Sequence, residues 1–355
     1  MAVALADTIL RRYPTADDYP FCSWSYPQGY LLVGLVKLWE VTGERRYYEY
    51  IREYCEYHVD AEGHLPRFTA NSMDAMMTGA ILVWMYQQTQ EERYAKACHT
   101  IRATFDDYPR TREGGFLHAR NLHPGEMWVD GVFMGQMFYI RYAKAFHEPG
   151  CWEETIRQLD LIYRYCHKHD GLLVHGYCED NLAAWADEEG RSGEIWSEGL
   201  GWYALILAEA LDYIPLGFAG RERAEGYYLE LLAGLKKYQH AESGLWHQVV
   251  DKGDDPANWC DTSGSAMFTY AIKHAVDLGL VPAAEYLPVA QRAYEGLLTR
   301  VTADEQGLID VHTACEGLCV QLRYEDYIDY PQKVNAQEAV CGYLWAFTLL
   351  EERQG

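Results

Sequence analysis

The hydrophobic positions of this chain follow a helical pattern along nearly its whole length. Apolar residues recur at spacings of three and four, which is the period of one buried face of an α-helix. The pattern predicts twelve helices, at residues 2–12, 27–42, 44–58, 71–89, 91–107, 130–147, 151–168, 195–214, 221–240, 262–279, 284–300 and 333–352. Twelve helices indicate an all-α fold built from six helical hairpins.

Short polar turns and a repeated glycine segment mark the boundaries of these hairpins. The tripeptides TGE at 42–44 and TQE at 89–91 each join a Leu/Trp-rich helix to a Tyr-rich one, as in an αα-hairpin. An acid-Gly-apolar-polar segment follows the outer helices, with its glycine at positions 63, 115, 171, 244 and 307. This repeat favours one domain of stacked hairpins over residues 1–355. If the hairpins close into a ring, the post-glycine residues share one mouth, including the histidines at 64, 118, 175, 247 and 312.

Composition and charge narrow the class of partner. The chain is 49% hydrophobic and 14% aromatic without a low-complexity tract, which is the composition of a folded globular protein. Asp and Glu outnumber Lys and Arg by 53 to 30, a formal charge of -23. Such a field repels nucleic-acid backbones and anionic lipid surfaces, so we expect neither nucleic acid nor a membrane as a partner. An anionic small substrate would need identifiable donors inside a pocket.

The N-terminal segment and the cysteines both indicate a cytoplasmic protein. MAVALADTILRRYP has too short an apolar stretch for a secretory signal, and no run of about 18 apolar residues occurs in the sequence. The ten cysteines show no paired C-x-x-C spacing and lie mostly on apolar helical faces, so we expect buried free thiols, not disulfides or zinc ligands. They are Cys22, Cys55, Cys98, Cys151, Cys166, Cys178, Cys260, Cys315, Cys319 and Cys341.

Two carboxylates stand near the start of otherwise apolar predicted helices. Asp130 lies in MWVDGVFMG, and Asp74 lies in NSMDAMMTGA. A hydrolytic site needs groups that exchange protons with substrate and water, and apolar surroundings raise the pKa of a carboxyl into the range of a general acid. Asp is also a common helix N-cap, so position alone leaves both interpretations of Asp130 open.

Aromatic and histidine side chains add candidates for sugar binding. The stretch WADEEGRSGEIWSEGLGWYALIL places Trp185, Trp196 and Trp202 beside acidic residues, and the apolar face of a sugar ring stacks on such rings. Core packing explains some of these tryptophans equally well. His118 and His175 either bind sugar hydroxyls, orient a carboxylate, or are satisfied residues of the rim. No HxxxH or HExxH spacing occurs, so we expect no metal site.

These segments together resemble glycoside hydrolase family 105, the unsaturated rhamnogalacturonyl hydrolases, and behind it family 88, the unsaturated glucuronyl hydrolases. The resemblance covers nearly the whole chain and includes YPQGYLLVGLVKLWEVTGE, PRTREGGFLH, MWVDGVFMG, GLLVHGY, WADEEGRSGEIWSEGLGWYAL, KYQHAESGLWHQVVDKG and SAMFTYAI. It implies an (α/α)6 barrel that hydrates the vinyl ether of a Δ4,5-unsaturated uronic acid at the non-reducing end of an oligosaccharide. A proton goes to C4, water adds at C5, and the resulting hemiketal opens and releases the neighbouring sugar.

The resemblance also implies roles for individual residues. Asp130 matches the proton donor of the family and Asp74 matches its second carboxylate, and the family needs no metal or organic cofactor. His118 and His175 match pocket histidines, and Trp128 is one of the aromatic positions that line the sugar site. The candidate substrate-binding residues are therefore His118, His175, Trp128, Met127, Trp185, Arg191, Trp196, Glu198 and Trp202.

One departure from the family pattern affects the substrate. Where the commonest pattern reads WGRxxGW, this chain reads WSEGLGW at 196–202, so Glu198 replaces an arginine. Arg is the usual partner of a uronate carboxylate because its guanidinium donates two parallel hydrogen bonds. Either Arg191, Lys333, His118 or backbone amides take this role, or the substrate differs from the rhamnogalacturonan disaccharide.

The sequence leaves two other functions open. A different (α/α)6 enzyme, such as a hydrolase of saturated glycosides or a sugar epimerase, would use the same acids and histidines. A non-catalytic glycan-binding protein would use the Trp-rich mouth, but two carboxylates at helix ends serve no purpose in it. The expected partner is in each case a small oligosaccharide, and the sequence defines neither its linkage nor the oligomeric state of the protein.

Overall fold

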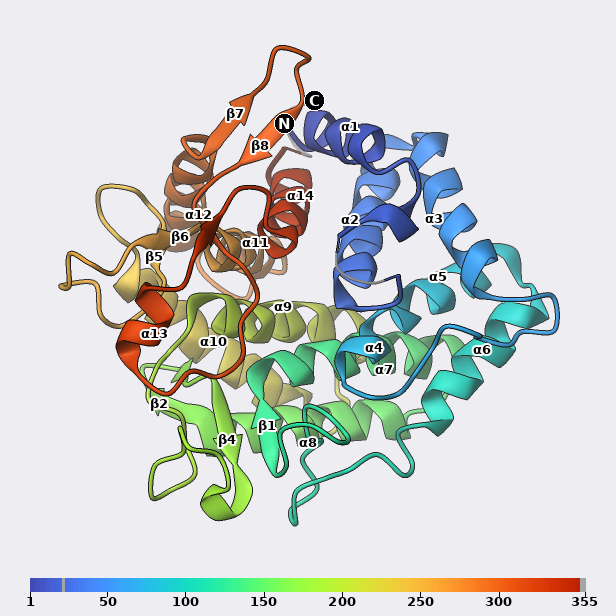
Figure 1. The fold of residues 1–355 in the computed structure, drawn as a ribbon, viewed down its shortest axis with the longest axis horizontal. Helices are drawn as coiled ribbons and strands as arrows, with labels where there is room; N and C mark the ends of the chain where they lie inside the picture. The colour runs from blue at the N-terminus through green and yellow to red at the C-terminus, as the bar shows by residue number, and fades with distance from the viewer. Residues whose placement is uncertain (21–22, 352–355) are drawn as a thin grey trace.

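Inner helices form a closed ring in the computed structural model, which describes residues 1–20 and 23–351. Each inner helix packs on the next, and the last packs on the first (Figure 1). These inner helices are apolar nearly all round because both of their sides are buried. In α9, for example, every residue from Ser197 to Leu211 is buried. The ring consists of α2 (Tyr26–Thr42), α4 (Asp74–Met77) with α5 (Gly79–Thr89), α7 (Val129–Phe146), α9 (Ser197–Tyr213), α11 (Thr262–Asp277) and α14 (Gln337–Glu351).

A second layer of helices surrounds the ring. These outer helices are amphipathic, as α3 illustrates by burying Tyr47, Tyr50 and Ile51 while its charged residues face outward. Each packs on the inner helix before it, except that α1 packs on α14, so the sixth pair joins the two ends of the described chain (Figure 1). The outer layer is α3 (Arg45–His58), α6 (Glu92–Ala103), α8 (Gly150–Cys166), α10 (Arg221–Tyr238), α12 (Ala283–Leu298) and α1 (Ala2–Arg12). The predicted (α/α)6 barrel is confirmed.

The twelve predicted helices are present in the described residues, and their ends differ by a few residues. The segment predicted at 71–89 begins only at Asp74 and is interrupted at Thr78, whose hydroxyl donates to the backbone carbonyl of Ser25 at 2.6 Å. One further α-helix of the described residues, α13 (Tyr324–Ile328), was not predicted because its five residues are too few to show a period.

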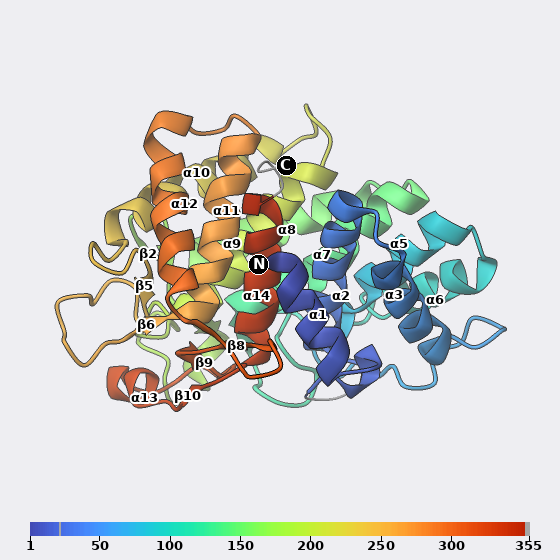
Figure 2. The same cartoon turned by 90° about the horizontal axis from the view of Figure 1, so that it is seen from above.

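Short two-stranded antiparallel sheets join the helices at the end of the barrel where the inner helices begin (Figure 2). Because β1 leads into α7 and β6 into α11, these sheets fix where the two helices start. Glycines of the repeated segment have left-handed φ at Gly63, Gly171, Gly244 and Gly307, but in the second repeat the left-handed residue is Gly114 instead of Gly115. The pairs are β1 (Glu126–Trp128) with β4 (Gly176–Cys178), β2 (His167–His169) with β3 (Leu172–Leu173), β5 (Trp246–His247) with β6 (Cys260–Asp261), β7 (Val301–Ala303) with β8 (Ile309–Val311), and β9 (Ala314–Cys315) with β10 (Gln332–Lys333).

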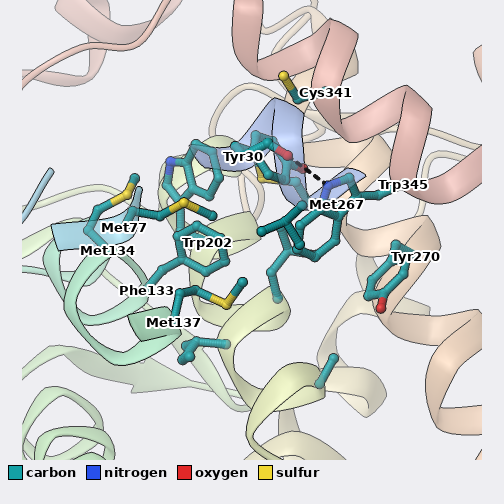
Figure 3. Close-up of a cluster of buried hydrophobic side chains, with 14 of the residues drawn as sticks. Tyr30, Met77, Phe133, Met134, Met137, Trp202, Met267, Tyr270, Cys341 and Trp345 are labelled. Atoms are coloured by element: carbon teal, nitrogen blue, oxygen red, sulfur yellow. Dashed lines mark hydrogen bonds between the residues drawn. The ribbon is translucent and has the colours of Figure 1, made fainter. Parts of the chain in front are cut away.

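Aromatic and methionine side chains fill the middle of the ring (Figure 3). The ring of Trp202 from α9 lies 4.9 Å from that of Tyr30 and 4.8 Å from that of Phe133, measured between centroids. The indole N–H of Trp345 donates to the backbone carbonyl of Tyr30 at 3.1 Å. This packed core closes the barrel at its middle, so a ligand has to approach from one end.

The cysteines of the described residues are free thiols, in agreement with the sequence prediction, and all except Cys260 and Cys319 are buried. Cys22 lies outside the described residues. Within residues 1–20 and 23–351, no helix combines the length and the apolar character needed to cross a bilayer.

Candidate active site

A cavity of about 380 Å³ lies at the end of the barrel where the inner helices begin. Helices α2, α4, α7 and α9 contribute to it, together with the segment 317–319 that follows β9. Its floor includes Trp202, which belongs to the packed core (Figure 3). The described lining residues are Tyr26, Ser72, Asp74, His118, Ala119, Leu122, His123, Trp128, Asp130, Met134, Trp196, Glu198, Trp202, Gly317, Leu318 and Cys319.

Acidic residues occupy the first turns of the inner helices around this cavity. The helix dipole places positive potential at an N-terminus, which stabilises a carboxylate there. The N-cap interpretation of Asp130 is wrong, because the N-cap of α7 is Trp128 and Asp130 is the second residue of the helix. The acids are Asp74 in α4, Asp130 in α7, Glu198 in α9, Asp261 immediately before α11, and Glu338 in α14.

Asp130 lies against a buried histidine. Its Oδ2 lies 3.2 Å from Nε2 of His175, and Nδ1 of His175 lies 2.9 Å from the hydroxyl of Tyr327. The backbone N–H of Gln321 donates to the hydroxyl oxygen of Tyr327 at 3.2 Å. Burial raises the pKa of Tyr327 well above its usual value, so the tyrosine keeps its proton and is able to donate it to Nδ1 of His175. Donation from Tyr327 to Nδ1 selects the tautomer with its N–H on Nε2, which faces Oδ2 of Asp130 but lies outside hydrogen-bond geometry.

Asp74 lies beside a second histidine. Its Oδ2 is 3.8 Å from Nε2 of His118, whose ring stacks on Trp128 with centroids 4.1 Å apart. Burial raises the pKa of Asp74, an effect that His118 opposes and the carboxylate of Asp130 reinforces, so Asp74 holds a proton to higher pH than an exposed aspartate does. A Cβ at position 131 would lie 3.2 Å from Nδ1 of His118, so Gly131 allows the histidine to approach the start of α7.

Glu198 lines the opposite part of the cavity and is only 1% exposed. Burial, together with the carboxylates of Glu338 and Asp261, raises the pKa of Glu198 well above its usual value. The hydroxyl of Ser263 lies 2.7 Å from Oε2 of Glu198, and the hydroxyl of Tyr26 donates to Oε1 of Glu338 at 2.6 Å. Among the described residues that line the cavity, none is Lys or Arg.

The structure brings most of the sequence candidates to one place. His175 lies beside Asp130 but does not line the cavity. The candidates that line the cavity are Asp74, Asp130, His118, Trp128, Trp196, Glu198 and Trp202. These residues come from four segments of the chain that only the ring brings together.

Four residues that the sequence offered for substrate binding lie away from the cavity. Met127 precedes Trp128 in strand β1, so its side chain points to the other side and is fully buried. Trp185 lies in the connection between β4 and α9, and it does not line the cavity. The guanidinium of Arg191 faces Glu189 at 3.4 Å, and Lys333 is paired with Glu316, so neither lies at the cavity.

The histidines expected at a common mouth do not all meet there. His64 pairs with Asp60 at the surface, His312 bonds to Thr302, and His247 lines a separate cavity. Asp60, Glu62 and His64 are a group within the described chain whose ligand atoms lie within 4.8 Å of one another, but none of the three lines the active-site cavity.

Several residues of the site were missed by sequence reasoning. Tyr26 is the first residue of α2, so it lies at the start of an inner helix as Asp74 and Asp130 do. A search of the first turn of each predicted inner helix would have included it. Segment 317–319 and Tyr327 follow no periodic pattern, so no local signal marks them. His123 and Ser72 lie in loops and become neighbours of Asp74 and Trp128 only through the fold.

A closed ring of helices with paired carboxyls, histidines and tryptophans at one end is the architecture of an (α/α)6 glycoside hydrolase, and the chain is an enzyme of that class. The profile of the family described as Glycosyl Hydrolase Family 88 matches residues 1–354, so the chain belongs to this family.

Individual relatives agree with this assignment. The solved structure of a family 105 glycoside hydrolase from C. acetobutylicum is 28% identical, with a TM-score of 0.92 and coverage of 99% of both chains. The unsaturated rhamnogalacturonyl hydrolase YesR of Bacillus subtilis is 24% identical over 318 residues, which are 88% of this chain and 85% of YesR. Protein Atu3128 of Agrobacterium fabrum is 37% identical over 180 residues, which are 49% of this chain and 76% of that protein. The resemblance to families 105 and 88 expected from the sequence is thus confirmed.

Proposed function

We propose that this glycoside hydrolase removes a Δ4,5-unsaturated uronic acid from the non-reducing end of small oligosaccharides made by polysaccharide lyases. The observation that carries the proposal is the placement of Asp74 and Asp130 at one cavity, the first with a raised pKa and the second beside His175. Two carboxyls in different environments are what acid and base steps of hydration need. The similarity to an unsaturated rhamnogalacturonyl hydrolase supports the same chemistry.

In this proposal Asp130 gives and then recovers one proton. Asp74, whose pKa is raised by burial and by the carboxylate of Asp130, supplies the proton in the free enzyme, and Asp130 delivers it to C4 of the sugar. Water adds at the resulting cation on C5 and returns a proton to Asp130, whose carboxylate is stabilised in between by the N–H of His175. The hemiketal breaks its bond between C5 and the ring oxygen, and the hemiacetal left at C1 releases the neighbouring sugar. One water molecule is consumed, and no oxidant or reductant is required.

Replacement of Asp130 by Asn tests this role. Because general acid catalysis contributes about 10²- to 10⁴-fold, we expect Asp130→Asn to lower kcat by at least that range with little change in thermal stability. The assay follows loss of the ultraviolet absorbance of the unsaturated uronate in pectic, glycosaminoglycan and ulvan-type lyase products. Asp254→Asn, at an exposed loop position, is the matched control. Retained activity of Asp130→Asn contradicts the acid role, and failure of the unsubstituted enzyme on every product contradicts the function.

We further propose that residues 1–355 act as one catalytic domain in the cytoplasm. The packing of α1 on α14, which completes the outer layer, supports a single unit. Free, mostly buried thiols suit a reducing compartment. Recovery of the activity in the cytoplasmic fraction of the native cell supports this location, and recovery outside the cell contradicts it.

A further inference from the structure

We propose that Glu198 acts as a neutral carboxylic acid that determines specificity, by accepting a hydrogen bond from an uncharged hydroxyl of the bound sugar. The identity of that sugar rests on the proposed function. Glu198 stands where the commonest family pattern has an arginine, and it lines the cavity from the first turn of α9. At this position the chain therefore has no cation to pair with the carboxylate of the uronic acid.

One hydroxyl proton has to serve two carboxyl groups beside the cavity. The Oγ of Ser263 lies 2.7 Å from Oε2 of Glu198 and 2.7 Å from Oδ2 of Asp261. A serine hydroxyl donates one proton, so the other short contact needs a proton on a carboxyl. Burial raises the pKa of Asp261 as well, but this carboxyl also accepts from the backbone N–H groups of Gly264 at 2.8 Å and Cys315 at 2.9 Å, which oppose the rise and which Glu198 lacks. The proton therefore lies on Glu198, which donates to Ser263, and Ser263 donates to Asp261.

The groups that face Glu198 from the surrounding elements are acidic or uncharged. Lys333, which acts on Glu338 from β10, is paired with Glu316. Burial without a cationic partner makes an ionised Glu198 unfavourable, so the neutral form persists at neutral pH. The facing titratable groups are Tyr26 and Tyr30 from α2, Asp130 from α7, Asp261 before α11, Cys315 from β9, Tyr330 after α13 and Glu338 from α14.

A neutral Glu198 has a definite consequence for the ligand. Its proton is engaged by Ser263 through Oε2, so Oε1 is the acceptor left for the cavity. A sugar hydroxyl satisfies such an acceptor, and a neutral group does not repel the uronate. Ionisation of Glu198 at alkaline pH adds a charge beside Asp130 and repels an anionic substrate. We therefore expect the KM for an unsaturated uronide to rise up to tenfold per pH unit above the pKa of Glu198, with kcat less affected.

Steady-state kinetics of Glu198→Gln over pH test this inference. Gln keeps the shape and a carbonyl acceptor but cannot ionise, so the KM of the variant should no longer rise with pH. Glu198→Ala removes the acceptor, and we expect its KM to be roughly tenfold higher at every pH, which is the effect of losing about one good hydrogen bond. If the KM of Glu198→Gln rises with pH as that of the unsubstituted enzyme does, the inference is overturned.

Thermal unfolding gives a readout that needs no substrate. A carboxyl whose folded pKa is raised loses stability as pH rises above its unfolded value, since the unfolded chain ionises and the folded chain does not. The Tm of Glu198→Gln relative to the unsubstituted protein should therefore increase as pH rises from about 4.5 toward 8.

Glu209→Gln on the same helix is the matched control. Burial alone would raise the pKa of Glu209, but Lys37 and Arg141 lower it well below its usual value. Its Tm deficit should therefore develop as pH rises toward about 4.5 and stay constant above that pH. A Tm difference for Glu198→Gln that does not grow above pH 4.5 overturns the neutral state, whatever the substrate. Lack of turnover on all unsaturated uronides would instead contradict the proposed function while leaving this result valid.

Discussion

The hydroxyl of Tyr327 is hydrogen-bonded to Nδ1 of His175, although neither side chain lines the cavity. It is joined to His175 across 152 residues of sequence by a bond of 2.9 Å. Tyr327→Phe removes that bond and leaves the tautomer of His175 unspecified. We expect kcat to fall roughly fivefold, the equivalent of about 1 kcal/mol, with KM changed less.

Steady-state kinetics with the unsaturated substrate measure this effect. Tyr324→Phe is a control on the same helix, since the hydroxyl of Tyr324 donates to Asp255 at 2.9 Å and is not part of the site. Equal kcat values for the two variants would show that Tyr327 does not position His175.

At the scale of residues, the sequence allowed the acids to be predicted because a lone carboxylate in an apolar helix start is a local feature. Asp74 and Asp130 were found in this way, and both line the cavity. The choice between Met127 and Trp128 depends on which side of β1 faces the cavity, which the alternation of a three-residue strand does not reveal. The bond between Tyr327 and His175 has no local signal at all.

At the scale of elements, left-handed glycines shape the connections at the mouth of the barrel. Gly171 and Gly307 occupy equivalent turns with φ of 72° and 75°, but only Gly171 is packed closely, against the backbone of Glu230 in α10. Gly307→Ala should cost about 1 kcal/mol of unfolding free energy from backbone strain alone. Gly171→Ala adds steric overlap with α10, and we expect a loss of about 2–4 kcal/mol. Urea unfolding compares the two variants, and equal losses would contradict the close packing.

The helical pattern of the sequence predicts the long helices but not the interruptions and short sheets between them. Long apolar periods located the inner and outer helices, because each has to bury a face against the ring. The interruption at Thr78 depends on a hydroxyl bond to Ser25, a contact between two helices that no single-segment pattern contains. The short sheets are likewise set by pairing between distant loops, as in β9 with β10.

At the scale of the whole molecule, a buried ion cluster ties four inner helices together. Glu209 of α9 accepts from Lys37 of α2 at 2.7 Å and from Arg141 of α7, and the hydroxyl of Tyr270 of α11 donates to it at 2.9 Å. Glu209→Gln leaves two cations without their anion, so we expect a loss of about 3–5 kcal/mol of unfolding free energy at pH 7.

Chemical denaturation at pH 7 measures this loss, with Glu92→Gln as an exposed control on α6, away from the cluster. The pKa of Glu209 is lowered in the fold, so its stabilisation is present above its unfolded pKa and fades as pH falls below about 4.5. A loss no larger than that of Glu92→Gln would mean that the cluster does not stabilise the ring.

The sequence did not show which two helices form the sixth pair that closes the ring. The sixth pair joins α1 to α14, which are the most distant helices in the chain, and no turn links them. The repeated hairpins made closure reasonable, but the identity of this pair is decided by the packing of the whole barrel (Figure 1).

A matched pair of disaccharides distinguishes protonation of a double bond from ordinary glycoside hydrolysis. The two substrates share the same neighbouring sugar and linkage and differ only in the C4–C5 double bond of the terminal uronic acid. Release of the neighbouring sugar is measured for both, with Asp130→Asn beside the unsubstituted enzyme. We expect cleavage of the unsaturated substrate alone, and its loss in the variant. Cleavage of the saturated substrate at a comparable rate would contradict hydration of a vinyl ether and identify an ordinary glycosidase.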